Sequence, residues 1–272
     1  MFSAIFASMN REKALEVSLP SWTKINKIKD FVIVDWSSSE PLIENKIIQE
    51  QINEYGNIKI IRVENQKYFY RCLAWNLAFQ NTNPENKILI KLDADYYNRG
   101  TSGHRGKGNS SWIDNLPLTA DRELKNCFYG GNLDLGYKLY GLLIVNKKHF
   151  KEGYNENIDA IWGFEDADLY YRIQKKYNIK IKKSIGSNYI FHIPHCEELR
   201  FENLKSGIKY LWKDQINLGP NFNEKYQFTD IGKDGKRLQT RTQCKNFHEW
   251  IPAEYTVLED SPSYRRVELI EQ

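Results

Sequence analysis

The 272-residue sequence predicts an α/β fold in which helices flank a mostly parallel central sheet. Two observations predict this fold: short apolar runs alternate with longer amphipathic segments, and several of the short runs are apolar almost throughout. Strand and helix in alternation favour parallel strands joined by crossover helices. Near-continuous apolar character is typical of strands that are covered on both faces.

The alternation is clearest in the first hundred residues. Apolar β-prone runs predict strands at residues 3–8, 30–36, 58–63 and 87–92. The amphipathic segments between them predict helices at residues 11–22, 42–55 and 70–80. In the second of these segments Ile43, Ile47, Ile48 and Ile52 recur at helical spacing.

The second half of the chain is less regular. A strand is predicted within residues 139–150, a helix with an acidic start over 162–177, and extended segments at 179–184 and 188–195. Residues 98–111 are rich in glycine, serine and basic side chains, which predicts a functional loop. From about residue 198 the sequence becomes polar and helical and then irregular, and residues 206–272 carry no motif that we can interpret.

Composition excludes several classes of protein. With 41% hydrophobic and 27% charged residues the chain is of ordinary globular type, and a net charge of +4 does not favour nucleic-acid binding. The four cysteines are scattered without a CxxC pair, which argues against zinc ribbons and disulfide scaffolds and favours a cytoplasmic protein. The N-terminus resembles a buried strand more than a signal peptide. No run approaches the ~20 apolar residues that span a membrane, so only peripheral membrane contact is left open.

The stretch KLDAD at residues 91–95 ends an apolar strand on two aspartates. Side chains alternate along a strand, so Asp93 and Asp95 are expected on one face with Ala94 opposite. Ligands of open parallel sheets bind at the carboxyl ends of the strands. Two carboxylates there form a site for Mg²⁺ or Mn²⁺, and the cation would offset their repulsion. The alternative is a pair of loop aspartates that cap backbone N–H groups.

Further motifs follow one another in a recognisable order. They are an R…L…SL helix (Arg11, Leu15, Ser18, Leu19), a VD-x-S strand end (Asp35, Ser37), an A-x-N-x-A helix (Ala74, Asn76, Ala78), the KLDAD strand end and the box WGFEDADL at residues 162–169. In this order they resemble nucleotide-sugar glycosyltransferases of the GT-A fold, particularly family 2. The WGFEDADL box resembles the acceptor-side segment of galactosyl- and N-acetylgalactosaminyl-type transferases.

This resemblance implies a Rossmann-like GT-A domain over residues 1–205, with a nucleotide-binding half (1–97) and an acceptor-binding half (98–205). Residues 206–272 would be an extension packed on that core. The implied donor is a UDP-sugar and the implied acceptor a carbohydrate. The implied donor-binding residues are Asp35, Arg11, Asn76, Lys91, Asp93 and Asp95.

The resemblance also implies a metal ion held by Asp95, Asp93 and a late histidine, His192 or, as second choice, His195. An imidazole beside carboxylates favours Mn²⁺ over Mg²⁺. Independently of the resemblance, one hypothesis is that the loop 98–111 closes over the donor diphosphate and excludes water. The alternative is an ordinary surface loop.

On the acceptor side, Asp166 would be the catalytic base and Glu165 would hold a sugar hydroxyl, as the resemblance implies. Trp162 would stack on the acceptor and Gly163 would leave room for it. Two carboxylates at a helix start are also favoured by the helix dipole alone. Asp168 and Arg172, four residues apart, can form an ordinary surface pair.

The expected function is therefore a metal-dependent, inverting transfer of a hexose or N-acetylhexosamine in surface polysaccharide or glycolipid synthesis. A retaining transferase and a non-catalytic sugar-nucleotide or glycan-binding module are alternatives. A nucleotidyltransferase is a weaker one, because it gives no reason for the WGFEDADL box. The sugar, the acceptor, the linkage and the oligomeric state are not indicated.

Overall fold

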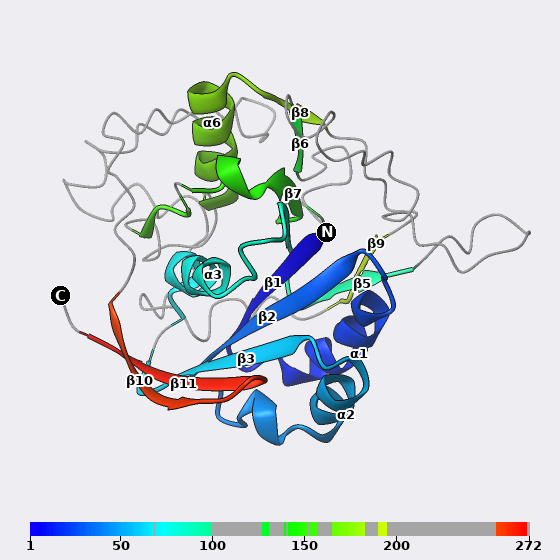
Figure 1. Cartoon of the computed structure of the whole chain (residues 1–272), viewed down its shortest axis with the longest axis vertical. Coiled ribbons are helices and arrows are strands. Elements are labelled where there is room, and N and C mark those ends of the chain that lie inside the picture. The colour runs from blue at the N-terminus through cyan, green and yellow to red at the C-terminus, as the bar shows by residue number, and fades with distance from the viewer. Residues whose placement is uncertain are drawn as a thin grey trace, which may run out of the picture.

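The central sheet is the main feature of the computed structural model, which describes residues 1–67, 69–99, 127–130, 139, 141–151, 153–156, 165–182, 190–194 and 254–270. Within these residues nine strands form one sheet in the order β10-β11-β3-β2-β1-β4-β7-β6-β8 (Figure 1). The sheet with its flanking helices confirms the predicted α/β fold. Its strands are β1 (Phe2–Ser8), β2 (Ile28–Trp36), β3 (Ile58–Val63), β4 (Ile88–Lys91), β6 (Cys127–Gly130), β7 (Leu143–Asn146), β8 (Lys180–Lys182), β10 (Tyr255–Asp260) and β11 (Tyr264–Leu269).

The sheet is mostly parallel, as predicted. Strands β11, β3, β2, β1 and β4 pair in parallel, and β6 pairs in parallel with β8. Among the described strands, β7 and β10 run in the opposite direction. The carboxyl ends of the five parallel strands therefore lie along one edge, where a ligand site is expected. Beyond that edge β5 (Tyr96–Asn98) and β9 (Ile190–His192) form a separate antiparallel pair.

Helices cover both faces of the sheet (Figure 1). On one face α1 (Glu12–Thr23) and α2 (Lys46–Tyr55) bury residues at helical spacing against the sheet, among them Leu15, Leu19 and Trp22. On the other face α3 (Arg71–Gln80) and α6 (Glu165–Tyr177) form a second core. The short turns η1 (Leu42–Glu44) and η3 (Lys147–His149) complete the connections. None of the helices in the described residues is long and apolar enough to cross a membrane.

The C-terminal hairpin of β10 and β11 lies in residues 206–272, where the sequence carried no motif that we could interpret. β11 lies parallel to β3 and extends the sheet on that side (Figure 1). Side chains fasten the hairpin to the core: Lys59 contacts Asp260 at 3.0 Å, and Arg265 donates to Asn81 at 2.6 Å. The alternation of the strand YRRVEL after the turn residues Ser261–Ser263 is the signal that could have predicted it. The proposed domain boundary at residue 205 stays a prediction.

Candidate active site

The two aspartates of KLDAD lie just beyond the end of β4 and contact different side chains. The strand ends at Lys91, and the chain then turns so that the backbone N–H of Tyr96 donates to the carbonyl of Asp93 at 3.0 Å. The alternation of a strand does not continue through a turn, so the expectation that Asp93 and Asp95 share one face is not supported. Asp93 Oδ1 contacts Lys91 Nζ at 2.8 Å, whereas Asp95 lies beside a histidine.

Asp95 and His192 form the part of the site that is best suited to a cation. Strand β5 pairs with β9 so that Tyr96 is opposite His192, and this pairing brings Asp95 Oδ2 to 3.4 Å from His192 Nε2. Adjacent ligands of an octahedral ion, each about 2.1 Å from the metal, lie about 3 Å apart. Within the described residues no cluster of three or more His, Cys, Asp or Glu residues could hold a metal. The expected ligands Asp93, Asp95 and His192 are therefore not found as one three-ligand cluster in the described residues. Asp95 and His192 alone lie close enough to act as two ligands of one divalent ion.

Helix α1 holds the aspartate loop by its backbone. Ser18 Oγ donates to the carbonyl of Ala94 at 2.6 Å, and Trp22 Nε1 donates to the carbonyl of Tyr96 at 2.6 Å. One turn away, Ser21 Oγ accepts from the backbone N–H of Asn98 at 2.9 Å. Ser18 and Trp22 are fully buried, so these bonds fix the loop from inside the protein. Ser18 belongs to the SL pair of the predicted first helix, where sequence reasoning gave it no role.

We expect the substitution Ser18→Ala to weaken Mn²⁺ binding about fivefold, because one buried hydrogen bond contributes about 1 kcal/mol to the ordered loop. Isothermal titration with Mn²⁺ in the presence of UDP measures this change. The matched control is Ser261→Ala, which removes a hydroxyl from the C-terminal turn. Equal metal affinities in all three proteins would show that α1 does not position the loop.

The amine of Lys91 contacts two carboxyl groups, those of Asp93 and Asp166. Its side chain is 0% exposed, and Nζ contacts Asp93 Oδ1 at 2.8 Å and Asp166 Oδ1 at 3.3 Å. Burial alone would lower the pKa of Lys91, but the negative charges of Asp166 and Asp93 outweigh it and raise the pKa. The expectation that Lys91 contacts the donor is not supported, because its amine is enclosed by protein groups.

The start of α6 brings two buried carboxylates to this place. Asp166 Oδ1 accepts from the hydroxyl of Tyr154 at 2.7 Å, and Glu165 Oε1 accepts from Arg71 at 2.9 Å. Glu165 Oε2 is buried with no hydrogen-bond partner among the described residues. Burial raises the pKa of Asp166 to about 6, although the charge of Lys91 opposes the rise. A carboxylate of this kind can accept a proton near neutral pH.

Two other residues that the sequence analysis singled out, Asp168 and Asn76, contact other groups of the protein. Asp168 Oδ2 accepts from Arg172 Nε at 2.7 Å, but both residues are buried, so this pair is not the surface pair that was expected. Asn76 is fully buried and pairs with the backbone N–H and carbonyl of Tyr154 at 2.7 and 2.9 Å. Its expected contact with the donor is not supported, and it instead fixes the loop that carries Tyr154.

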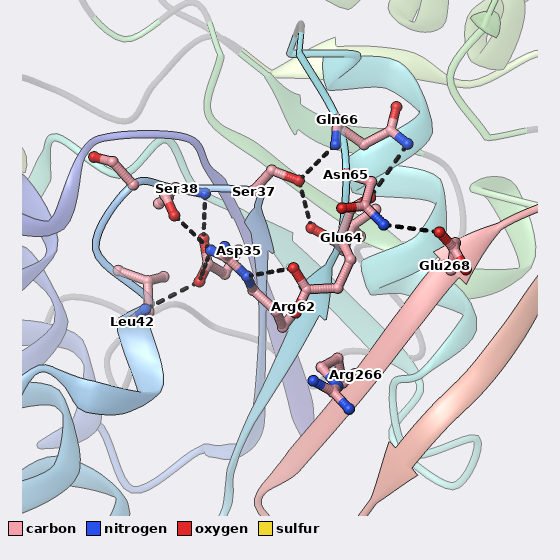
Figure 2. Close-up of polar contacts among 12 residues, drawn as sticks. Asp35, Ser37, Ser38, Leu42, Arg62, Glu64, Asn65, Gln66, Arg266 and Glu268 are labelled. Carbon is pink, nitrogen blue, oxygen red and sulfur yellow. Dashed lines mark hydrogen bonds and ion pairs between the residues drawn. The ribbon is translucent and has the colours of Figure 1, made fainter.

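The carboxylate of Asp35 is also hydrogen-bonded to other groups of the protein (Figure 2). Its carboxylate accepts from the backbone N–H groups of Ser38 and Leu42 at 3.1 and 3.0 Å and from Arg62 Nη1 at 2.9 Å. The side chain is 1% exposed, so Asp35 shapes the loop after β2 and has no free face for a nucleoside. Arg11, at the start of α1, is partly exposed near the carboxyl edge.

Several predicted residues lie outside the described part of the chain. These are Trp162, Gly163, His195 and all of the loop 98–111 except Asn98 and Arg99. The structure also adds residues that sequence reasoning missed, namely Arg71, Trp75 and Tyr154. They stand in or beside buried elements, where a polar or aromatic side chain gives no signal distinct from packing.

Comparison with known proteins gives one family-model match and several matches to solved structures. Residues 123–196 match the family model described as the N-terminal domain of galactosyltransferase. No curated protein matches the sequence of this chain.

Solved structures share the fold at low sequence identity. They include TarS 1-349 from S. aureus (16% identity, TM-score 0.52, 71% of this chain and 60% of that one). The catalytic domain of Drosophila β1,4-galactosyltransferase 7 in complex with xylobiose matches over 100% of this chain and 94% of its own, at 14% identity and a TM-score of 0.52. GalNAc-T7 with UDP, GalNAc and Mn²⁺ matches at 15% identity and a TM-score of 0.51, over 72% of this chain and 44% of that one. At these identities the likeness concerns the fold.

Proposed function

We propose that this chain, which has the GT-A fold, is a glycosyltransferase that transfers a hexose or N-acetylhexosamine from a UDP-sugar to a carbohydrate hydroxyl with inversion at the anomeric carbon. The match of residues 123–196 to a galactosyltransferase domain supports this proposal. The observation that carries the proposal is that Asp95 meets His192 just beyond β4 while Asp166, from a third segment, meets Lys91 at the end of β4. Solved structures of the same fold that contain UDP, GalNAc and Mn²⁺, or xylobiose, support this choice of donor and acceptor.

The donor side is formed by Asp95 and His192, which would hold a divalent cation. Such a cation supplies positive charge against the diphosphate that leaves. Asp93 lies next to this pair. One of its carboxylate oxygens contacts Lys91, and its side chain is 32% exposed. It can therefore still meet a donor hydroxyl or the cation. Mn²⁺ is the preferred ion because one ligand is an imidazole.

The acceptor side is formed by Asp166 and Glu165. The hydroxyl oxygen of the acceptor attacks the anomeric carbon, the bond from that carbon to the diphosphate breaks, and Asp166 takes the hydroxyl proton. Tyr154 and Lys91 both contact Oδ1 of Asp166, which leaves Oδ2 as the oxygen that receives the proton. Glu165 would accept a hydrogen bond from a sugar hydroxyl at Oε2, and the lack of a protein partner for this atom among the described residues supports that role.

The test is a panel of UDP-galactose, UDP-N-acetylgalactosamine and UDP-glucose with Mn²⁺ and oligosaccharide acceptors, with release of UDP as the measured quantity. We expect turnover of at least one donor and its loss when EDTA is added. Proton NMR of the product gives the anomeric configuration. Binding of donors without any release of UDP would identify a non-catalytic module, and a product with the donor's own configuration would contradict inversion.

A further inference from the structure

We propose that Lys91 is a positioning residue that holds the donor-side carboxylate Asp93 and the acceptor-side base Asp166 on one buried ammonium group. This inference rests on the proposed function, because it concerns how the donor side and the acceptor side of that site are held in fixed positions relative to each other. It departs from the sequence prediction, in which Lys91 contacts the donor.

The ammonium group has no face left for a ligand. A lysine amine has three N–H donors. Two of them are directed to Asp93 at 2.8 Å and to Asp166 at 3.3 Å, and the amine also lies 3.6 Å from the ring centroid of Trp75. Since the side chain is 0% exposed, its charge acts only on these protein groups. A fully buried lysine with such a set of partners is rare and strongly anchored.

The protein forms a cage around this amine from four separate segments. Trp75 belongs to α3 and Asp166 to α6. The ring centroid of Tyr154 lies 5.8 Å from the amine. Gly141 lies against the same two side chains. A Cβ atom there would overlap Asp93 Oδ2 and lie 2.9 Å from the amine, so a larger residue would displace Asp93 or Lys91.

The cage links groups that have different tasks in the proposed reaction. Asp93 belongs to the loop that carries Asp95, and Asp166 begins α6, 75 residues after Lys91 in the sequence. Asp166 also has Glu165 beside it and Asp93 nearby, so it is surrounded by negative charge apart from Lys91. The positive charge therefore both orients Asp166 and offsets the repulsion between Asp166 and Asp93.

The experiment compares Lys91→Met, Asp166→Asn and the double variant with the wild type, using UDP release with the best donor and acceptor. Methionine keeps the apolar stem against Trp75 but removes the charge. We expect Lys91→Met to lower kcat about 100-fold. Because residues that act as a unit are not additive, the double variant should be no slower than Asp166→Asn alone. The matched control is Lys29→Met, which removes an exposed lysine from β2 and should leave kcat unchanged.

The possible outcomes separate the two claims. If the losses of the single variants multiply in the double variant, or if Lys91→Met keeps the wild-type kcat, Lys91 does not act through Asp166. If Lys91→Met does not fold, the double variant should still fold, since it no longer buries Asp166 as an unpaired charge, and a double variant that is also unfolded contradicts the pairing. A wild-type protein that turns over no UDP-sugar contradicts the proposed function itself, and the role of Lys91 with it.

Discussion

Replacement of Asp166 by asparagine is expected to lower kcat for glycosyl transfer about 1000-fold while the Kd for the UDP-sugar changes less than threefold. The reason is that a positioned general base contributes about 10²- to 10⁴-fold to a rate, and an amide cannot accept the hydroxyl proton. Asparagine has nearly the shape of aspartate, so the hydrogen bond from Tyr154 and the contact with Lys91 can remain. Steady-state kinetics and donor titration measure the two quantities.

The pH dependence of kcat/KM provides a second test of Asp166 as the base. Burial raises the pKa of Asp166 to about 6, and the charged groups that face it are Lys91 on β4, its neighbour Glu165 and Asp93. The base form is present above this pKa and lost below it, so kcat/KM should fall about tenfold for each pH unit below 6. Because kcat/KM reports the free enzyme, this profile applies to the protein before the donor binds.

Two controls make the Asp166 prediction specific. Asp260→Asn changes an exposed aspartate of the C-terminal hairpin and should keep both kcat and the pH profile. A melting curve shows whether Asp166→Asn is folded. A folded Asp166→Asn protein with more than a tenth of the wild-type kcat would exclude Asp166 as the base, and so would a profile that stays flat between pH 5 and 7.

The sequence predicts the sheet and the approximate place of the site because both depend on local patterns. The strands from Phe2 to Lys91 follow from apolar runs, and acidic residues at the start of α6 follow from the helix-start pattern. Asp95 and His192 were paired because the family resemblance implies a late histidine as a metal ligand. The two side chains lie 3.4 Å apart, and their role as ligands stays a prediction. These features need no knowledge of side-chain direction.

The parts that sequence could not predict depend on tertiary contacts. Lys91 sits in an apolar strand, and nothing local shows that its amine meets Asp166 at a separation of 75 residues. Asp35 and Asn76 lie where a ligand contact is expected, but their polar atoms are used by neighbouring backbone groups. Strand β7 also runs antiparallel to β4, a direction that an apolar run does not reveal.

Loss of the metal pair is the second large effect. We expect Asp95→Asn to abolish measurable Mn²⁺ binding at micromolar concentrations and to lower turnover at least 100-fold, since a bound cation supplies several kcal/mol of charge stabilisation and 1.36 kcal/mol is a factor of ten. His192→Ala should weaken Mn²⁺ more than Mg²⁺, because imidazole favours the former. The resulting change in the ratio of the two affinities is the signature of His192 as a ligand.

Electron paramagnetic resonance of Mn²⁺ measures this binding without reference to activity, and Glu54→Gln on the exposed side of α2 is the matched control. Asp95 and His192 are only 14% and 18% exposed, and they lie 3.4 Å apart, so a cation that binds there must contact both side chains. If Asp95→Asn binds Mn²⁺ as tightly as the wild type, the metal does not lie between β5 and β9. In that case Asp93, released from Lys91, becomes the ligand to test, and Lys91 could not hold Asp93 and Asp166 together during turnover.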